Sequence, residues 1–199
     1  MKIVIATRNK GKLAQYTSIF RGAGVDFCTL DDIGYTREVI EDSGTFEGNS
    51  FLKANQIHQD TGLAALGDDS GLVINALDGR PGVDTAYYAG DENTPRLHRL
   101  NTLLAEMKDK TDRSARFETH ITCILEDGRV VRSKYFLNGS ISKEIVDLNV
   151  GLTFEPVFIP EGYDKTLSQF DQETKLKITH RAKAVQKLLE ELRGIGVIK

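Results

Sequence analysis

Two adjacent carboxylates, Asp68 and Asp69, follow a short apolar run at residues 63–67 that is typical of a buried strand. Ser70 and Gly71 come next as turn residues. Carboxylates at a strand end in an α/β protein lie where ligands usually bind. They could hold Mg²⁺, with water and substrate phosphates as the other ligands, or activate an attacking water. An Asp-rich turn is the alternative interpretation, and the buried flanks on both sides favour a site.

A polar segment follows the first apolar run of the chain. It consists of Thr7, Arg8, Asn9, Lys10, Gly11 and Lys12. Free backbone N–H groups at a helix N-terminus, the helix dipole and two lysines would suit phosphate. Lys12 is the better phosphate ligand because it lies in the first helical turn. The segment matches neither a P-loop nor a dinucleotide fingerprint, and a capped turn with two solvated lysines is the alternative.

A third group of polar residues spans residues 41–53. Thr45 is expected to cap a helix on which Asn49 and Lys53 are four residues apart, so that they share one face. Glu41 before this helix and Lys53 on it could serve a metal and a phosphate together. A solvated amphipathic helix explains the same pattern equally well.

His180 and Arg181 form a fourth group at the expected start of the last helix. Arg and His at a helix entry can bind a nucleobase edge or a phosphate, although such a pair is more often on the surface. The other histidines, His58, His98 and His120, lack ligand-like spacing, which argues against a zinc site.

The composition narrows the class of protein. The chain has 199 residues, 26 Lys and Arg against 29 Asp and Glu, and a net charge of -3. This mild acidity argues against a nucleic-acid polymer as partner. The apolar runs are too short for a membrane span or a signal peptide, so we expect a cytoplasmic protein. Cys28 and Cys123 stand in apolar contexts, which favours buried thiols over a disulfide.

The elements that must position these groups are expected from hydrophobic periodicity and turn residues. The opening order of strand, loop, helix and strand indicates an α/β fold. We further expect a strand that ends just before Asp68 and a hairpin that turns at residues 126–128. A helix capped by Thr94, with Pro95 in its first position, is also expected. The expected strands are 2–6, 25–30, 63–67, 117–125, 129–137, 141–150 and one within 151–160; the expected helices are 10–20, 47–60, 94–107, 166–174 and 179–192.

Taken in order, these segments resemble the inosine triphosphate pyrophosphatase family. The matches span nearly the whole chain in the family's order, so chance is a poor explanation. They are Thr7 to Lys12, Glu41 through Thr45-Phe46, Asn49 with Lys53-Ala54, Asp68-Asp69-Ser70-Gly71-Leu72, Pro81-Gly82-Val83, Tyr88-Ala89-Gly90, Arg116-Phe117, Pro156-Val157-Phe158 and His180-Arg181.

The resemblance implies a fold and a reaction. The fold would be one α/β domain over residues 1–199, an elongated mixed β-sheet with helices forming two lobes around a central substrate cleft, usually as a homodimer. The reaction would be Mg²⁺-dependent hydrolysis of non-standard purine nucleoside triphosphates, such as ITP, dITP and XTP, to the monophosphate and pyrophosphate. Its role would be sanitation of the nucleotide pool.

The resemblance also implies roles for single residues. Asp69 would be the general base, and Glu41, Asp68 and Asp69 would lie at the metal. Phe154 would stack on the base. The residues expected at the substrate are Thr7, Arg8, Asn9, Lys10, Gly11, Lys12, Lys53, Ser70, Leu152, Thr153, Phe154, Glu155, Lys175, His180 and Arg181.

Departures from the family pattern concentrate in the base pocket. Thr153 stands for a glycine, Glu155 for Asp, and Tyr87 for Arg. A pyrophosphatase with shifted base specificity, acting on standard or modified nucleotides, is therefore an alternative. A septum-inhibitor-type pyrophosphatase is disfavoured because residues 7–12 do not fit its Ser-x-Ser-x-x-Arg motif. A nucleotide sensor without turnover is disfavoured because Asp68 and Asp69 are both present.

Overall fold

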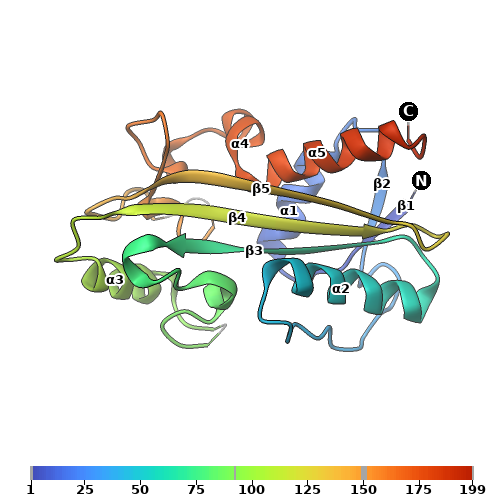
Figure 1. Ribbon diagram of the computed structural model, residues 1–199, viewed down its shortest axis with the longest axis horizontal. Coiled ribbons are helices and arrows are strands. Elements are labelled where there is room, and N and C mark those ends of the chain that lie inside the picture. Colours follow the sequence, from blue (N-terminus) through green and yellow to red (C-terminus); the bar gives the residue numbers. More distant parts are fainter. Residues whose placement is uncertain (1, 92, 149–151, 199) are drawn as a thin grey trace. The chain divides into compact units, whose positions relative to one another are not determined.

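The computed structural model describes residues 2–91, 93–148 and 152–198, which form an α/β fold (Figure 1). This confirms the predicted class and the mixed sheet, whose strand order is β2-β1-β3-β4-β5-β6. The strands are β1 (Lys2–Ile5), β2 (Asp26–Thr29), β3 (Ala65–Ile74), β4 (Ser114–Ile124), β5 (Val130–Ile141) and β6 (Phe158–Pro160). The α-helices are α1 (Lys10–Phe20), α2 (Phe46–Thr61), α3 (Arg96–Glu106), α4 (Gln172–Ile178) and α5 (His180–Gly194).

The chain forms two compact units. Unit 1 consists of Met1–Asp69, Thr119–Tyr135 and His180–Lys199, and unit 2 of Ser70–Glu118 and Phe136–Thr179. Strands β3, β4 and β5 therefore contribute residues to both units. The single domain and the substrate cleft expected from the family resemblance stay predictions.

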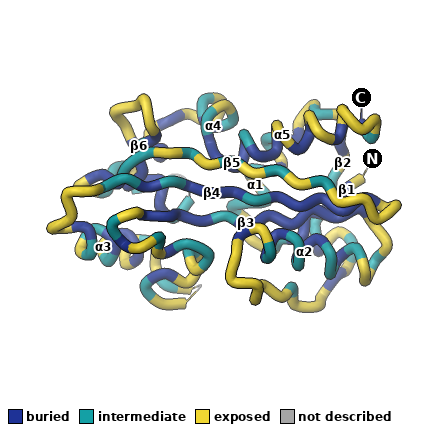
Figure 2. Tube along the Cα trace, viewed as in Figure 1, coloured by how far each residue is buried: buried dark blue, intermediate teal, exposed yellow. Residues whose placement is uncertain are grey.

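In unit 1, side chains alternate along the strands toward helices on opposite faces of the sheet. Strand β1 pairs in parallel with β2 and β3. Ile3 and Ile5 pack with residues of α1 and α5, whereas Val4 packs with Ile57 of α2. Figure 2 shows β1 and β3 buried over most of their length. Near-continuous apolar strands are expected where helices cover both faces of a sheet.

Gly67 allows α2 to lie directly against β3. A Cβ atom at this position would stand 2.0 Å from the carbonyl oxygen of Ser50 and 2.8 Å from the amide nitrogen of Ala54. Both atoms belong to the backbone of α2, so only glycine permits this approach. The close contact brings the polar face of α2 to the residue that follows on the same face of β3, Asp69.

Unit 2 has its own apolar core around the far half of β3. Leu72 and Ile74 pack with Leu100 and Leu103 of α3 and with a group of aromatic rings. Those rings belong to Tyr88, Phe117, Phe154, Phe158 and Phe170. Strand β6 pairs in antiparallel fashion with the end of β5. This core is what holds residues 154 and 155 in place.

Several expected boundaries are wrong. The helix predicted over residues 166–174 is a 3-10 turn at Leu167–Gln169 followed by α4 at Gln172–Ile178. The strand predicted over residues 63–67, with a turn at Asp68, instead runs without a break from Ala65 to Ile74. Ion pairs satisfy the two carboxylates, so the chain keeps its sheet pairing through them instead of turning into solvent. Thr94 does not cap α3: Pro95 is the N-cap residue, and the Thr94 hydroxyl accepts the amide N–H of Asp91.

The strand predicted over residues 141–150 is also wrong for its described part. Strand β5 ends at Ile141, and residues 142–148 form no strand; residues 149 and 150 lie outside the described residues. Their backbone instead makes single bonds, from Ser142 N–H to the Val157 carbonyl and from Val146 N–H to the Pro156 carbonyl. No helix in the described part of the chain is long and apolar enough to cross a membrane.

Candidate active site

The adjacent carboxylates of β3 point to opposite faces of the sheet, because side chains alternate along a strand. Asp68 lies on the face of α1 and α5, where it contacts Arg181 and Lys12. Asp69 lies on the face of α2, where it contacts Lys53 and Asn49. The two residues that the sequence places side by side are therefore built into two different polar clusters of unit 1.

Asp68 is enclosed by donors. Arg181 Nε donates to its Oδ2 at 2.6 Å, and the Tyr16 hydroxyl donates to the same oxygen at 3.0 Å. Lys12 Nζ lies 3.4 Å from Oδ1 and donates to the backbone carbonyl of Asp68 at 3.1 Å. Arg181 also donates to Gln15. The side chains of Asp68 and Arg181 are 0% and 1% exposed, so this cluster is shielded from water.

The charges of this cluster set the protonation of its members. Burial alone would raise the pKa of Asp68, but the Arg181 and Lys12 cations hold that pKa well below its ordinary value. Asp68 is therefore ionised at neutral pH. Burial and the neighbouring Arg181 cation lower the pKa of His180 well below 6.5, so its imidazole is neutral.

Asp69 belongs to a more open cluster. Lys53 Nζ lies 3.3 Å from Asp69 Oδ1 and 2.6 Å from Glu41 Oε2. Asn49 Nδ2 donates to Asp69 Oδ2 at 3.1 Å, and the amide oxygen of Asn49 accepts from the backbone and hydroxyl of Ser43. Glu41 keeps 47% of its side-chain surface exposed, so this cluster is accessible from outside.

Helix α2 presents Asn49 and Lys53 on one face, as their spacing predicts. Thr45 is the N-cap residue and accepts the amide N–H of Gly48, also as predicted. Both Asn49 and Lys53 are buried against β3. Burial excludes the alternative in which this face of the helix is solvated.

The two carboxylates of β3 have pKa shifts of opposite sign. Burial raises the pKa of Asp69, and the Lys53 and Lys12 cations and the Asn49 hydrogen bond only partly oppose this rise. For Lys53, the Asp69 and Glu41 carboxylates outweigh burial and raise its pKa. A carboxylate with a raised pKa is a stronger base, which suits it to accept a proton from water.

The segment at residues 7–12 forms the N-terminal cap of α1. Asn9 is the N-cap residue and accepts the amide N–H of Lys12, and Thr7 accepts the amide N–H of Asn9. Arg8 contacts Asp31 and the carbonyl of Tyr35. Lys10 is exposed, whereas Lys12 reaches Asp68. The structure thus brings Lys12, and not Lys10, to the carboxylate cluster.

The residues expected at the base lie in unit 2, except His180 and Arg181. Phe154 and Glu155 are buried, and Lys175 Nζ lies 2.7 Å from Glu155 Oε2. The rings of Tyr88 and Phe154 meet edge to face, with centroids 5.8 Å apart. Ser70 is half-buried at the first position of unit 2. Among the residues expected at the base, the Glu155–Lys175 ion pair is therefore the main polar contact, and it directly follows the aromatic ring of Phe154.

Several residues that contact the expected site residues were not predicted from the sequence. Gln15 and Tyr16 follow Lys12 at helical spacing of three and four, which was a usable signal for a shared polar face. Leu152 and Thr153 accept hydrogen bonds from Arg96 through their carbonyl oxygens. No local pattern marks Arg96, because its partners are more than fifty residues away in the chain.

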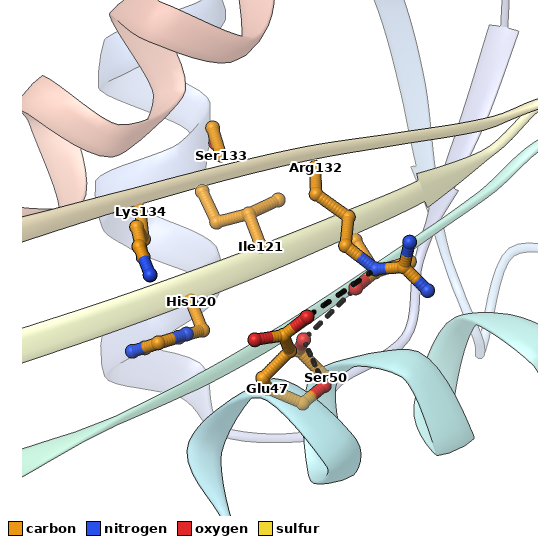
Figure 3. A pocket seen from close by; sticks show the side chains of 8 residues that line it. Glu47, Ser50, His120, Ile121, Arg132, Ser133 and Lys134 are labelled. Carbon is orange, nitrogen blue, oxygen red and sulfur yellow. Dashed lines mark hydrogen bonds and ion pairs between the residues drawn. The ribbon is translucent and has the colours of Figure 1, made fainter.

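A polar hollow of about 180 Å³ lies elsewhere in unit 1 (Figure 3). Arg132 and Lys134 of β5, His120 of β4 and Glu47 of α2 line it, and none of the residues expected at the substrate or metal does. At its edge Arg132 Nε lies 3.9 Å from the Glu47 carboxylate. The hollow therefore does not coincide with either carboxylate cluster.

Glu41 and Asp69 converge on one point, the ammonium group of Lys53. The described residues contain no group of three or more His, Cys, Asp and Glu side chains that could hold a metal ion. Mg²⁺ is commonly held by one or two carboxylates, with water and substrate phosphates as the remaining ligands. The two carboxylates therefore fit an ion of this kind that binds together with a phosphate.

The chain is similar to known proteins over nearly its whole length. It is 38% identical over 189 residues to a dITP/XTP pyrophosphatase of Bacillus licheniformis, covering 94% of this chain and 95% of that protein. It is 36% identical over 195 residues to a dITP/XTP pyrophosphatase of Flavobacterium johnsoniae, covering 96% and 98%. The Ham1 protein of Staphylococcus aureus superimposes with a TM-score of 0.87 at 31% identity, covering 98% of this chain and 100% of that one. The model of the Ham1 family matches residues 3–191, and the chain belongs to this family.

Proposed function

We propose that the protein hydrolyses non-standard purine nucleoside triphosphates, such as ITP, dITP and XTP, to the nucleoside monophosphate and pyrophosphate. The observation that carries this proposal is Asp69, a buried carboxylate of raised pKa beside Lys53 and Glu41. The relatives that bear the name dITP/XTP pyrophosphatase support the class of substrate. The protein is thus a hydrolase that acts on an acid anhydride.

Cations and a helix N-terminus bind the triphosphate. Thr7, Asn9 and Lys12 stand at the start of α1, where free N–H groups and the helix dipole favour negative charge. Lys53 provides a second ammonium group, now shared by Glu41 and Asp69. The remaining residues expected along the phosphates are Arg8, Lys10, Gly11 and Ser70. Because a phosphoryl transfer needs little covalent help, positioning and charge are the main contributions of the protein.

Asp69 accepts a proton from the attacking water. The water oxygen bonds to the α-phosphorus. The bond from that phosphorus to the α–β bridging oxygen breaks, and pyrophosphate leaves with this oxygen. Asn49 holds Asp69 by donating to its Oδ2, which leaves the carboxylate oriented for this transfer. Glu41 and Asp69 would hold Mg²⁺, which when bound neutralises phosphate charge and lowers the pKa of water. Asp68 fixes Arg181 and Lys12 on the opposite face of β3, and it is the third carboxylate expected at the metal.

The base is recognised by Phe154, Glu155 and Lys175, with His180 and Arg181 nearby in the family pattern. The buried ring of Phe154 offers a stacking surface, and the Glu155–Lys175 pair offers an acceptor and a donor. A neutral His180 adds a hydrogen-bonding group without charge. Leu152 and Thr153 precede these residues on the same segment. The proposal also includes a homodimer, as the family resemblance implies, and a location in the cytoplasm, as expected from the short apolar runs of the sequence.

Product analysis tests the proposal. The wild-type protein is incubated with Mg²⁺ and each of ITP, XTP, dITP, ATP and GTP, and the products are separated by ion-exchange chromatography. We expect monophosphate and pyrophosphate from ITP and XTP, and a loss of about 10²–10⁴-fold in turnover for Asp69→Asn. Asp26→Asn, at an exposed residue of unit 1, is the matched control. Release of orthophosphate with a diphosphate, or full turnover by Asp69→Asn, would contradict the proposal.

A second candidate, the same reaction with shifted base specificity, is favoured by Thr153 and Glu155. Glu155 carries one methylene more than the family's Asp, and its carboxylate is already held by Lys175. The same nucleotide panel decides between the two, since turnover of ATP or GTP equal to that of ITP and XTP would support the shifted specificity.

A further inference from the structure

Helix α3 carries two arginines, Arg96 and Arg99, that hold two separate loops of unit 2 by their backbone carbonyls. Neither belongs to a motif that the sequence singled out. They stand three residues apart and therefore lie on neighbouring positions of one helix face. Each guanidinium donates to carbonyl oxygens on segments that carry an aromatic ring of the unit 2 core.

Arg96 binds the segment just before the stacking ring. Its Nη1 donates to the carbonyl of Leu148 at 2.7 Å, its Nε to the carbonyl of Thr153 at 3.2 Å, and its Nη2 to the carbonyl of Leu152. A planar guanidinium presents its donors in fixed directions, so the bonds to Leu152 and Thr153 fix the backbone of these two residues. Phe154 follows immediately.

Arg99 does the same for the loop that carries Tyr88. Its Nε donates to the carbonyl of Thr94 at 3.1 Å, and its two Nη atoms donate to the carbonyls of Ala86 and Asp91. The Arg99 side chain itself is buried, so its charge depends on these carbonyls for hydrogen-bond partners.

The two held loops meet at the rings of Tyr88 and Phe154, which pack edge to face at 67°. Arg96 is also electrostatically coupled to the base-reading carboxylate: burial lowers the pKa of Arg96, and the negative charge of Glu155 opposes this. Glu155 in turn lies 2.7 Å from Lys175. Arg96 therefore binds the backbone directly before the ring, and its charge acts on the carboxylate that follows the ring.

We propose that Arg96 is a positioning residue that sets the affinity of the site for the nucleobase by fixing the Leu152–Thr153 backbone ahead of Phe154 and Glu155. The proposal rests on the proposed function, since it assigns these two residues to the base. Without Arg96 the carbonyls lose their donors and the segment adopts several conformations. Binding a base then requires ordering the segment, which weakens binding of the base and leaves binding of the phosphates unchanged.

Calorimetric titration tests this with two probes, the non-hydrolysable α,β-imido analogue of ITP and inorganic tripolyphosphate, which lacks a base. For Arg96→Gln we expect the Kd of the analogue to rise about 10-fold or more, equivalent to about 1.4 kcal/mol, with the Kd of tripolyphosphate unchanged. Arg96→Lys should give a smaller rise, because an ammonium group cannot bind three carbonyls in a fixed fork. In turnover of ITP, the KM should rise with little change in kcat.

Arg80→Gln is the matched control, since Arg80 is an exposed arginine of the same unit that pairs with Glu106. A parallel rise in both Kd values for Arg96→Gln would indicate a general structural role and overturn the proposal, as would an unchanged Kd for the analogue. If the wild type binds the analogue but releases no pyrophosphate from ITP, the proposed function fails while the binding ratio still decides the role of Arg96. No binding of the analogue by the wild type would overturn both.

Discussion

The polar residues of unit 1 and unit 2 are organised in different ways. In unit 1, Asp68 is bound by donors of α1 and α5 and Asp69 by donors of α2, and each carboxylate has both a cation and a neutral donor as partners. In unit 2, Glu155 and Lys175 form an ion pair beside a group of aromatic rings. A triphosphate requires the same charges whatever its base, whereas a base is read by shape and a few polar groups. Thr153, Glu155 and Tyr87, the departures from the family pattern in the expected base pocket, all lie in unit 2, whereas Ser43, which stands for a usual glycine, lies in unit 1.

Within unit 1, strand alternation places two neighbouring carboxylates in two clusters with different surroundings. The pKa of Asp68 is lowered by Arg181 and Lys12 despite burial, while burial raises the pKa of Asp69. Environments that shift two titratable groups in opposite directions are typical of catalytic sites. Asp68 therefore stays charged, whereas Asp69 can exchange a proton.

The largest effect is expected from Arg181→Met. The substitution leaves the ionised and fully buried Asp68 without its shortest ion pair, which we expect to lower the free energy of unfolding by about 3–5 kcal/mol. Urea denaturation followed by circular dichroism measures this. Arg193→Met, at an exposed position of the same helix, is the control. A loss under about 1 kcal/mol would contradict the anchoring role of the Asp68 cluster.

Lys53→Met should affect every nucleotide equally. Lys53 serves Glu41 and Asp69 and would contact phosphates rather than a base. Loss of hydrogen bonds to charged groups costs about 1.5–3 kcal/mol, which lowers kcat/KM by roughly 10–100-fold. Steady-state kinetics with ITP, XTP and ATP measure the effect, with Lys2→Met, an exposed lysine, as control. A loss that differs tenfold between bases would break the proposed division between the two units.

Glu155→Asp, in contrast, should affect nucleotides differently according to their base. The shorter carboxylate restores the family's residue, so we expect the ratio of kcat/KM for ITP over ATP to rise by about 10-fold, with the better substrate little changed in kcat. The same panel measures this ratio, and Glu144→Asp, at an exposed position of unit 2, is the control. An unchanged ratio would mean that the Glu155–Lys175 pair does not set base preference.

Local patterns predicted α1, α2 and α5 well, but not α4, which carries Lys175. Helix α1 begins and ends at the expected residues, because Asn9 caps its start and glycines follow its end. The face shared by Asn49 and Lys53 follows from helical spacing alone. These features depend on residues within one or two turns of each other, which the sequence displays directly.

Features that depend on distant partners were not predictable. The continuation of β3 through Asp68 requires Arg181, which is 113 positions away. The support of Leu152 and Thr153 by Arg96 joins positions 56 and 57 residues apart. A carboxylate pair within a strand, or an arginine near a helix start, has a turn or a solvated surface as its usual explanation. Only the tertiary contacts show that the carboxylates of β3 continue a strand and that Arg96 binds distant carbonyls.

The smallest predicted effect is the contribution of His180, which lies next to Arg181, to the pH dependence of the free energy of unfolding. The folded protein holds the pKa of His180 well below 6.5, chiefly through burial and then the Arg181 cation. The unfolded chain has a pKa near 6.5. Below that pH the unfolded state binds a proton that the folded state does not, so this residue makes the free energy of unfolding fall as pH falls.

For His180→Asn this contribution disappears. Between pH 7.5 and 5.5 the wild type should therefore lose about 1.4 kcal/mol more of its free energy of unfolding than the variant does. Urea denaturation at both pH values measures the difference, and the contributions of Asp68 and Asp69 cancel because both proteins retain them. His98→Asn, at an exposed residue of unit 2, controls for loss of an imidazole. Equal losses in wild type and His180→Asn would show that burial and the Arg181 cation do not keep His180 neutral in the folded protein.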